Sequence, residues 1–278
     1  MAYVGTEMSL HVLAYNLKRV IIVFGLAKTM KAMQLAGAWP TILAMSSQYE
    51  CLRPDHLYRD IFDVDAPSDT AVGRQVWPRR SGVFIRNQPA PPSVEGAEHP
   101  YPGAIAHELV VGQFGLVPPW VKSASDAKLR STKLVNARSE TASTSNNFRG
   151  AWLGAQRCIV PMMAFQEDDL RSSKAVPTRV ARVDGKPMGV AGLWERWTGA
   201  QGEVIVSFCL LTVNANSHAL MHRYGQPGSE KRMLAILNEG SYGAWLSAAH
   251  PEKAREFMRA YPAAGLTANP IEKKSSAV

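Results

Sequence analysis

The sequence contains none of the common catalytic signatures. A GxSxG nucleophile elbow, an HExxH zinc motif, a Walker phosphate loop and a GxGxxG dinucleotide fingerprint are all missing from its 278 residues. Cysteine is scarce as well. Cys51, Cys158 and Cys209 are odd in number and far apart, so they predict neither a disulfide framework nor a CxxC metal site. We therefore expect no metal and no cofactor, and a reducing cytoplasm as the compartment.

The sequence also lacks an apolar run that is long enough to cross a bilayer, which takes roughly 20 residues. The run 20–27 is too short for this. Basic residues precede it and small residues follow it, as in a signal peptide, but Lys28 and Lys31 interrupt the region where an apolar core should continue. We therefore expect a protein without a membrane partner.

Basic residues outnumber acidic residues, and this is the first positive signal. Thirty-one Lys and Arg against 23 Asp and Glu give a net charge of +8. Hydrophobic residues make up 46% of the chain, which is ordinary for a folded protein with one large domain or two small ones. The excess of positive charge favours a polyanionic partner, because phosphates attract clustered Lys and Arg and release counterions when they bind.

The pattern of apolar residues predicts many short strands and few helices. Strands are expected at 83–86, 108–116, 157–161, 178–183, 188–194 and 204–213, with 165–169 as a polar continuation of 157–161. Helices are expected at 54–64, 144–154, 242–248 and 251–260, and the proline-rich stretch 87–103 as an extended loop. This order predicts an α+β fold with a mostly antiparallel sheet, rather than a doubly wound one.

Residues 135–141 concentrate polar chemistry in a short stretch. Asn136, Arg138, Ser139 and Glu140 supply an amide, a guanidinium, a hydroxyl and a carboxylate, directly after the basic, polar run 122–133. By itself this pattern is equally typical of a solvated loop, with Asn136 as a turn residue and Arg138 as a surface ion-pair partner.

The first 44 residues differ from the rest. Apolar residues recur there at helical spacing, and the segment 6–20, TEMSLHVLAYNLKRV, resembles the C-terminal helix of DDE insertion-sequence transposases. That resemblance implies a fused remnant of a mobile element, and an unrelated helical extension is the alternative. A second start occurs at Met45. We therefore expect a helical extension at 1–44, a domain at 45–270 and a polar tail at 271–278.

Six blocks of the second segment occur in a recognisable order. They are FGLVPPW at 114–120, NARSET at 136–141, RCIVP at 157–161 with Phe165 and Glu167, AGLWE at 191–195, LTVNAN at 211–216 and KRM at 231–233. Together they resemble the SRAP family, the SOS response-associated peptidases or abasic site processing proteins, over roughly residues 45–270. The resemblance implies a compact single α+β domain around a β-barrel-like sheet, with a positively charged groove for single-stranded DNA.

The resemblance also implies a chemistry. Family members lose the initiator methionine and expose a cysteine, whose amine and thiol capture the aldehyde of an abasic site as a thiazolidine in the DNA damage response. An α-amine has a pKa of about 7.7 to 8.0, so a fraction of it is neutral and nucleophilic at cellular pH. The family is described as peptidase, hydrolase and lyase. The resemblance further implies that the protein is a monomer, that it is cytoplasmic and that it joins the nucleoid when it binds DNA.

Five residues take family roles in this sequence. Asn136 matches the asparagine that positions the linkage, and Glu167 matches the glutamate that acts as a general acid or base. Arg138 and Arg232 match phosphate contacts, since a planar guanidinium suits oxyanions. Trp120 is expected to stack on an unpaired base. The alternatives are a core lid for Trp120 and a solvated acidic face for Glu167, which adjoins two aspartates.

The sequence departs from the family at the nucleophile. Ser46 stands where the family has its cysteine, and a hydroxyl is a far weaker nucleophile than a thiolate. Ser46 also lies inside the chain if translation begins at Met1, so that it has no free α-amine. Cys51 is five residues away and cannot supply a thiol on the same residue as the amine.

The histidine block and two basic positions also depart from the family. The family histidine lies close before Arg-Met, whereas His222 is separated from Arg232 by the insertion 223–231. His222 is the catalytic candidate if that insertion folds it back, and His218 is the weaker alternative. Gln48 and Asn146 stand where arginines are common. These changes predict weaker DNA binding and impaired crosslinking.

Three hypotheses follow from the sequence. The chain is an abasic site processing protein by descent, or a catalytically impaired single-stranded-DNA-binding relic, or an autopeptidase that removes residues 1–45 to expose Ser46. Whether it is an enzyme at all depends on which of these holds.

Overall fold

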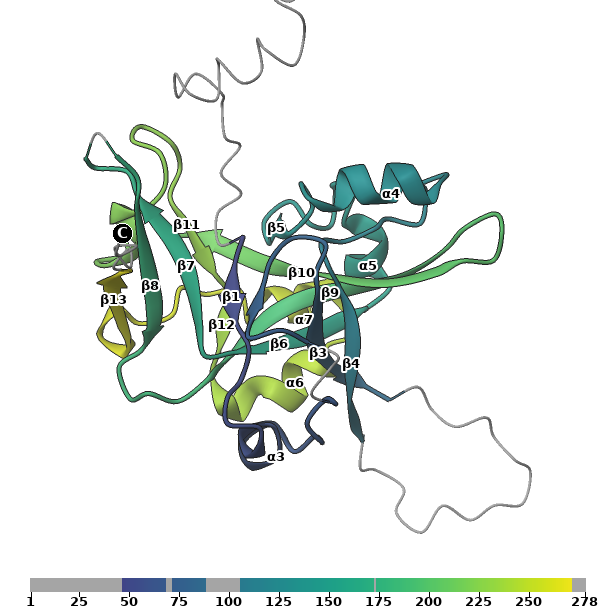
Figure 1. Ribbon diagram of the computed structural model, residues 1–278, viewed down its shortest axis with the longest axis horizontal. Coiled ribbons are helices and arrows are strands. Elements are labelled where there is room, and N and C mark those ends of the chain that lie inside the picture. Colours follow the sequence, from purple (N-terminus) through teal and green to yellow (C-terminus); the bar gives the residue numbers. More distant parts are fainter. Residues whose placement is uncertain (1–46, 69–71, 89–105, 173, 272–278) are drawn as a thin grey trace, which may run out of the picture. The chain divides into compact units, whose positions relative to one another are not determined.

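The strands of the chain form two sheets, one of which closes on itself (Figure 1). The structure, a computed structural model, describes residues 47–68, 72–88, 106–172 and 174–271, which belong to one unit. The expectations for the extension 1–44, for Ser46, for nearly all of the proline-rich loop and for the tail fall outside these residues.

Five strands form the closed ring. They are β3 (Ser81–Asn87), β4 (His107–Phe114), β6 (Arg157–Met162), β9 (Met188–Thr198) and β10 (Val204–Asn214). The order runs β10-β4-β3-β6-β9 and returns from β9 to β10. The pairing of β10 with β4 is parallel, and the other four pairings are antiparallel. Closure of the ring leaves these strands without a free edge.

Three short strands extend this barrel. The strands β5 (Asn136–Arg138) and β11 (Arg232–Leu234) both pair with the C-terminal half of β10, and β12 (Ile236–Leu237) pairs with β9. The last residues of β10 therefore lie between the polar stretch at 136–138 and the Lys-Arg-Met block.

A second sheet has the order β13-β8-β7-β1-β2. Its strands are β1 (Tyr49–Glu50), β2 (Gln75–Val76), β7 (Ala164–Asp169), β8 (Val176–Arg182) and β13 (Leu266–Pro270). The expectation that 165–169 continues the strand before it is wrong, because the chain changes sheets at Met163. The Met163 amide donates to the Glu50 carbonyl at 2.9 Å, and from there the backbone pairs with β1 instead of β9.

An aromatic cluster joins the two sheets. The ring of Tyr49 on β1 lies 5.4 Å from that of Phe114 on β4, which in turn lies 5.5 Å from Phe208 on β10. All three side chains are fully buried. Gly82 leaves room for them, since a Cβ there would come within 2.3 Å of the Tyr49 hydroxyl. The two-residue strand β1 is therefore held against the barrel by its side chain as well as its backbone.

The helices are short and lie around the sheets. They are α3 (His56–Phe62), α4 (Ala124–Ser131), α5 (Arg149–Leu153), α6 (Tyr242–Leu246), α7 (Pro251–Arg255) and the 3-10 turns η1 (Met221–Arg223), η2 (Glu239–Ser241) and η3 (Ala263–Gly265). The part of the chain that the structure describes holds no helix long and apolar enough to span a membrane.

The sequence predicted the strands better than the helices. The expected strands 83–86, 108–116, 157–161, 178–183, 188–194 and 204–213 are confirmed, and so is the α+β fold with a mostly antiparallel, barrel-like sheet. The expected helix 144–154 is reduced to α5, and Leu153 is half exposed instead of joining an apolar stripe. The helix α4 inside the run 122–133 was not expected, although Ser123 caps it by accepting from the Asp126 amide.

Candidate functional site

Glu167 is buried beside the start of the described chain. The antiparallel pairing of β1 with β7 places Tyr49 opposite Phe165, and it continues as the Gln166 amide donates to the Gln48 carbonyl at 3.0 Å. One residue further along this antiparallel register, Ser47 lies opposite Glu167. The Glu167 side chain is 5% exposed, so it is not part of a solvated acidic face.

Two side-chain contacts anchor the short strand β1. Arg179 of β8 reaches across β7 and forms a two-point ion pair with Glu50, with Nε 2.9 Å from Oε1 and Nη2 2.8 Å from Oε2. On the other side, the Gln48 amide donates to Gln75 at 2.7 Å. Gln48 is itself buried, so at this position, where the family often has an arginine, the side chain joins β1 to β2. The beginning of the domain is thus fixed relative to Glu167.

A pocket of about 450 Å³ opens at the end of β7, two residues beyond Glu167. It lies between β7, β8, β13 and η1, and its lining includes Asp169, Arg171, Arg223 and Tyr224. Glu167 and Asp169 are two residues apart on β7 and so face the same side of the sheet. Burial raises the pKa of Tyr224, and the carboxylates of Asp169 and Glu167 add to this effect. Arg171 pairs with Asp169, whereas Arg223 makes no ion pair within the described residues.

The two histidines have different environments. His218 is buried, and its Nε2 donates to the Tyr261 carbonyl at 2.7 Å while Nδ1 accepts from the Met221 amide at 2.9 Å. Nδ1 of His218 therefore holds the start of the η1 turn, and Nε2 ties this turn to Tyr261. His222 is exposed, and its Nδ1 donates to the His218 carbonyl at 2.7 Å. That bond orients the ring and leaves Nε2 as the nitrogen for proton transfer, so a catalytic role for His222 stays a prediction.

The polar stretch 135–141 begins as a strand. β5 pairs in parallel with β10, with Asn136 opposite Leu210 and Arg138 opposite Thr212. Because side chains alternate along a strand, the buried Ala137 faces the core while Asn136 and Arg138 point to the other side. The ladder with β10 thus sets the direction of both predicted site residues.

Arg232 is the centre of a charged network that includes the last residues of the polar stretch 135–141. Its guanidinium forms a two-point contact with Glu140, at 3.0 and 2.7 Å, and donates to Glu230 at 2.8 Å and to the Thr212 carbonyl at 2.7 Å. Burial lowers the pKa of Arg232, but Glu140 and Glu230 outweigh it and raise the value above that of a free arginine. The guanidinium therefore stays charged and ties β11 to the turn after β5. Contact of Arg232 with phosphate stays a prediction.

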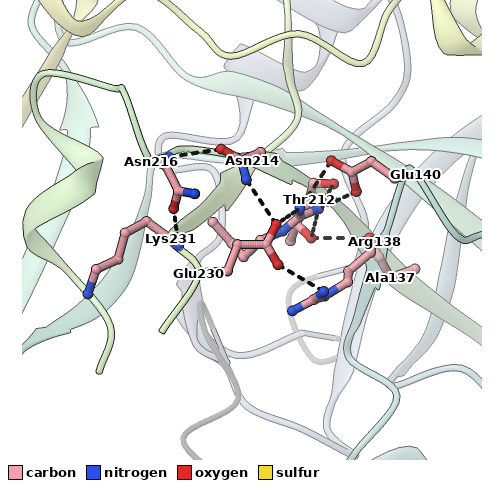
Figure 2. Close-up of polar contacts among 9 residues, drawn as sticks. Ala137, Arg138, Glu140, Thr212, Asn214, Asn216, Glu230 and Lys231 are labelled. Atoms are coloured by element: carbon pink, nitrogen blue, oxygen red, sulfur yellow. Dashed lines mark hydrogen bonds and ion pairs between the residues drawn. The ribbon is translucent and has the colours of Figure 1, made fainter. Parts of the chain in front are cut away.

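The network also reaches the exposed Arg138. Its guanidinium lies 2.8 Å from Oε2 of Glu230, whose other oxygen accepts from Asn214. Asn216 and Lys231 continue the contacts, since the Lys231 amide donates to the Asn216 side chain at 2.7 Å (Figure 2). The sequence reasoning missed Glu140 and Glu230 as organising residues. Glu140 was noted only as one of the polar groups of residues 135–141, and Glu230 precedes the block KRM at 231–233 without belonging to it.

Trp120 lies on the surface and has cationic neighbours. It is 42% exposed, and its indole nitrogen donates to the Asn146 carbonyl at 3.0 Å. The Arg130 guanidinium lies 4.8 Å from the ring centre. Trp120 also lines a pocket of about 640 Å³ that includes Arg149 and Asn147. Trp120 is therefore a surface side chain and not a core lid, and its stacking on a base stays a prediction. Arg130 was hinted at by the basic run, whereas nothing in the spacing pointed to Arg149.

The three cysteines are all buried. Burial raises the pKa of the Cys51 thiol to about 12 and that of Cys209 to about 12, and it also raises the pKa of Cys158. A thiolate is the reactive form of cysteine, so none of these residues offers a nucleophile in the folded state.

This burial predicts a loss of stability at alkaline pH. A thiol whose pKa is raised by folding is protonated in both the folded and the unfolded state below about pH 8. At higher pH the thiol ionises first in the unfolded state, which favours unfolding. Cys51 and Cys209 are therefore each expected to lower the free energy of unfolding by about 1.4 kcal/mol per pH unit between roughly pH 9 and 12. Urea unfolding at pH 8 and at pH 10 measures this change in the free energy of unfolding. A Cys51→Ala, Cys209→Ala variant should have a flatter profile, and an equally steep one would contradict the prediction.

Comparisons with known proteins agree with the blocks in the sequence. Residues 45–278 match the family described as SOS response associated peptidase (SRAP). The abasic site processing protein YoqW of Bacillus subtilis is 30% identical over 154 residues, which cover 54% of this chain and 63% of YoqW. The abasic site processing protein YoaM of the same organism is 34% identical over 105 residues, 37% of this chain and 44% of YoaM. The chain thus spans less than two thirds of the length of these relatives.

A solved structure extends the likeness over nearly the whole described region. A protein from Bordetella bronchiseptica is 40% identical, with a TM-score of 0.70, and the match covers 82% of this chain and 100% of that chain. The family match begins at residue 45 and does not include residues 6–20, so their likeness to transposases stays a prediction.

Proposed function

Because the chain belongs to the SRAP family, we propose that it recognises abasic sites in single-stranded DNA and binds them without forming a stable crosslink. It would act in the cytoplasm as part of the response to DNA damage, as a monomer that joins the nucleoid when it binds DNA. The proposal has two parts, DNA recognition and the loss of covalent capture.

Ser46 is the observation that supports the loss of covalent capture. In a thiazolidine, the amine nitrogen attacks the aldehyde carbon, water leaves, and the thiol sulfur adds to the resulting C=N bond while its proton moves to nitrogen. Ser46 carries a hydroxyl in place of the thiol, and its nitrogen is an amide in a chain that begins at Met1. The buried thiols of the domain offer no replacement.

Three family positions would serve the recognition of a sugar without a base. Glu167 would donate or accept a proton at the sugar, Asn136 would orient it, and His222 would assist through Nε2. The adjoining pocket, with Arg223 at its edge, has room for the neighbouring part of the DNA. These assignments follow the family positions, and the burial of Glu167 supports them.

The exposed aromatic and basic groups fit a DNA strand. Arg138, Arg149 and Arg223 are exposed, and the chain as a whole has a net charge of +8. Trp120 would offer a ring face to an unpaired base, and the Arg130 guanidinium lies over the same ring. Stacking on an aromatic side chain combined with phosphate contacts is the usual way to bind single strands without sequence preference.

Trp120→Ala is expected to weaken binding of a single-stranded oligonucleotide about tenfold, because base stacking contributes roughly 1 to 3 kcal/mol. Fluorescence anisotropy at constant salt measures the dissociation constant. Trp77→Ala is the matched control, since Trp77 is 50% exposed and lies in the turn before β3. Equal affinities for the two variants would show that Trp120 is not a stacking platform.

Incubation of the purified chain with abasic single-stranded DNA tests the proposed function. A complex in a native gel that disappears on denaturation supports it, whereas an adduct that survives denaturation shows covalent capture. The absence of any complex contradicts DNA recognition.

The alternative function is an autopeptidase that removes residues 1–45 and exposes the Ser46 amine. Its amine and hydroxyl would then give an oxazolidine, which hydrolyses more easily than a thiazolidine. Intact-mass measurement distinguishes this alternative, because a chain that stays at full length excludes the processing.

A further inference from the structure

Glu230 lies at the end of the segment 223–231 and joins two arginines that differ in burial. Its Oε1 accepts from Arg232 at 2.8 Å and from Asn214 at 3.0 Å, while its Oε2 lies 2.8 Å from Nη1 of Arg138 (Figure 2). The Arg232 side chain is 4% exposed and that of Arg138 is 58% exposed. One oxygen is therefore held by the buried Arg232 and the exposed Asn214, and the other faces the cation of Arg138 at the surface.

Arg232 does not depend on Glu230 alone for charge balance. Glu140 already contacts both of its terminal nitrogens, at 3.0 and 2.7 Å. The carboxylate of Glu230 is therefore not needed to neutralise Arg232, and it neutralises Arg138 instead. The two arginines and two glutamates of this network carry no net charge between them, although the chain as a whole is strongly basic.

We propose that Glu230 occupies the position of a DNA phosphate at Arg138 and so sets the affinity of the interface by competing with the DNA backbone. A carboxylate and a phosphodiester both offer anionic oxygens to a guanidinium. Arg138 must give up one ion pair to gain the other, so its net contribution to binding is small. Arg232 and Asn214 hold the Glu230 carboxylate in place, and it cannot follow Arg138 onto the DNA.

Glu230→Gln tests the competition, which presupposes the DNA binding proposed above. The amide keeps an oxygen for Arg232 and Asn214 but turns its NH₂ group toward Arg138, which releases that guanidinium. The variant is expected to bind a fluorescein-labelled oligonucleotide carrying a tetrahydrofuran abasic analogue about three- to tenfold more tightly at low salt. The plot of log affinity against log salt should steepen by about 0.7, as one more phosphate contact requires.

Glu239→Gln is the matched control. Glu239 on η2 also lies 2.8 Å from an arginine, Arg182, and its loss changes the net charge of the chain by the same amount. Adding Arg138→Gln to Glu230→Gln should remove the gain in affinity. Thermal melts of each variant check the fold, and Glu230→Ala serves as a second variant if the amide disturbs β11.

A second readout needs no DNA binding at all. Phenylglyoxal should modify Arg138 faster in Glu230→Gln than in the unchanged chain, as measured by peptide mass spectrometry. Unchanged reactivity of Arg138 overturns the competition even if no variant binds DNA, an outcome that would separately refute the proposed function. Affinity equal to that of Glu239→Gln also overturns it. Weaker binding overturns it too, and would mean that Glu230 positions Arg138 for the DNA.

Discussion

A chain that begins at Met45 and carries Ser46→Cys is expected to form an adduct with abasic single-stranded DNA that survives denaturation, whereas the unchanged chain forms none. Removal of the initiator methionine places an α-amine and a thiol on the same residue, as thiazolidine formation requires. The amine has a pKa of about 7.7 to 8.0, so it is partly neutral at pH 7.5. Glu167 and Asn136 are already present in the chain. A denaturing gel with labelled DNA measures the adduct.

The full-length chain with Ser46→Cys is the matched control. It carries the same thiol, but residue 46 then has an amide nitrogen, so no thiazolidine and no stable adduct is expected. Glu167→Gln in the shortened chain should slow adduct formation by about 10²- to 10⁴-fold if Glu167 transfers a proton. If the shortened variant is folded and gives no adduct, the site has lost more than its nucleophile.

Arg232→Met is expected to lower the free energy of unfolding by about 3 kcal/mol, because it leaves two carboxylates beside each other without their buried cation. For a domain of this size the melting temperature should fall by about 6 to 12 °C. Arg232 is 5% exposed and contacts Glu140, Glu230 and Thr212, so a methionine of similar length fills the space but replaces none of the bonds. Urea unfolding measures the change.

Two comparisons separate this structural role from contact with DNA. Arg59→Met removes an arginine that is also paired with two carboxylates, Asp63 and Asp65, but on an exposed surface, and it should leave the stability unchanged. Arg232→Lys keeps the charge but not the two-point contact with Glu140, and it should recover part of the stability. An Arg232→Met variant that stays as stable as the unchanged chain and loses DNA affinity would instead make Arg232 a direct phosphate contact.

The sequence predicted the strands well because strands buried on both faces consist of contiguous apolar residues, which are visible without coordinates. Strands such as β6 and β10 were found for this reason. The helices were predicted less well, since α4 and α5 are short and depend on packing more than on a long amphipathic pattern. The change of sheet at Met163 was missed, because it depends on pairing with β1, more than 100 residues earlier in the chain.

The sequence by itself determined the family, through six blocks in order, and it placed Ser46 where a thiol should be. Only the tertiary structure decided what the charged residues do. It buried Glu167 next to the start of the domain, left Trp120 exposed beside Arg130, and paired Arg138 with Glu230. Residue identity states which charges a chain carries. Which charge neutralises which is decided by distances across sheets, because an ion pair between residues 138 and 230 exists only when β5, β10 and β11 lie side by side.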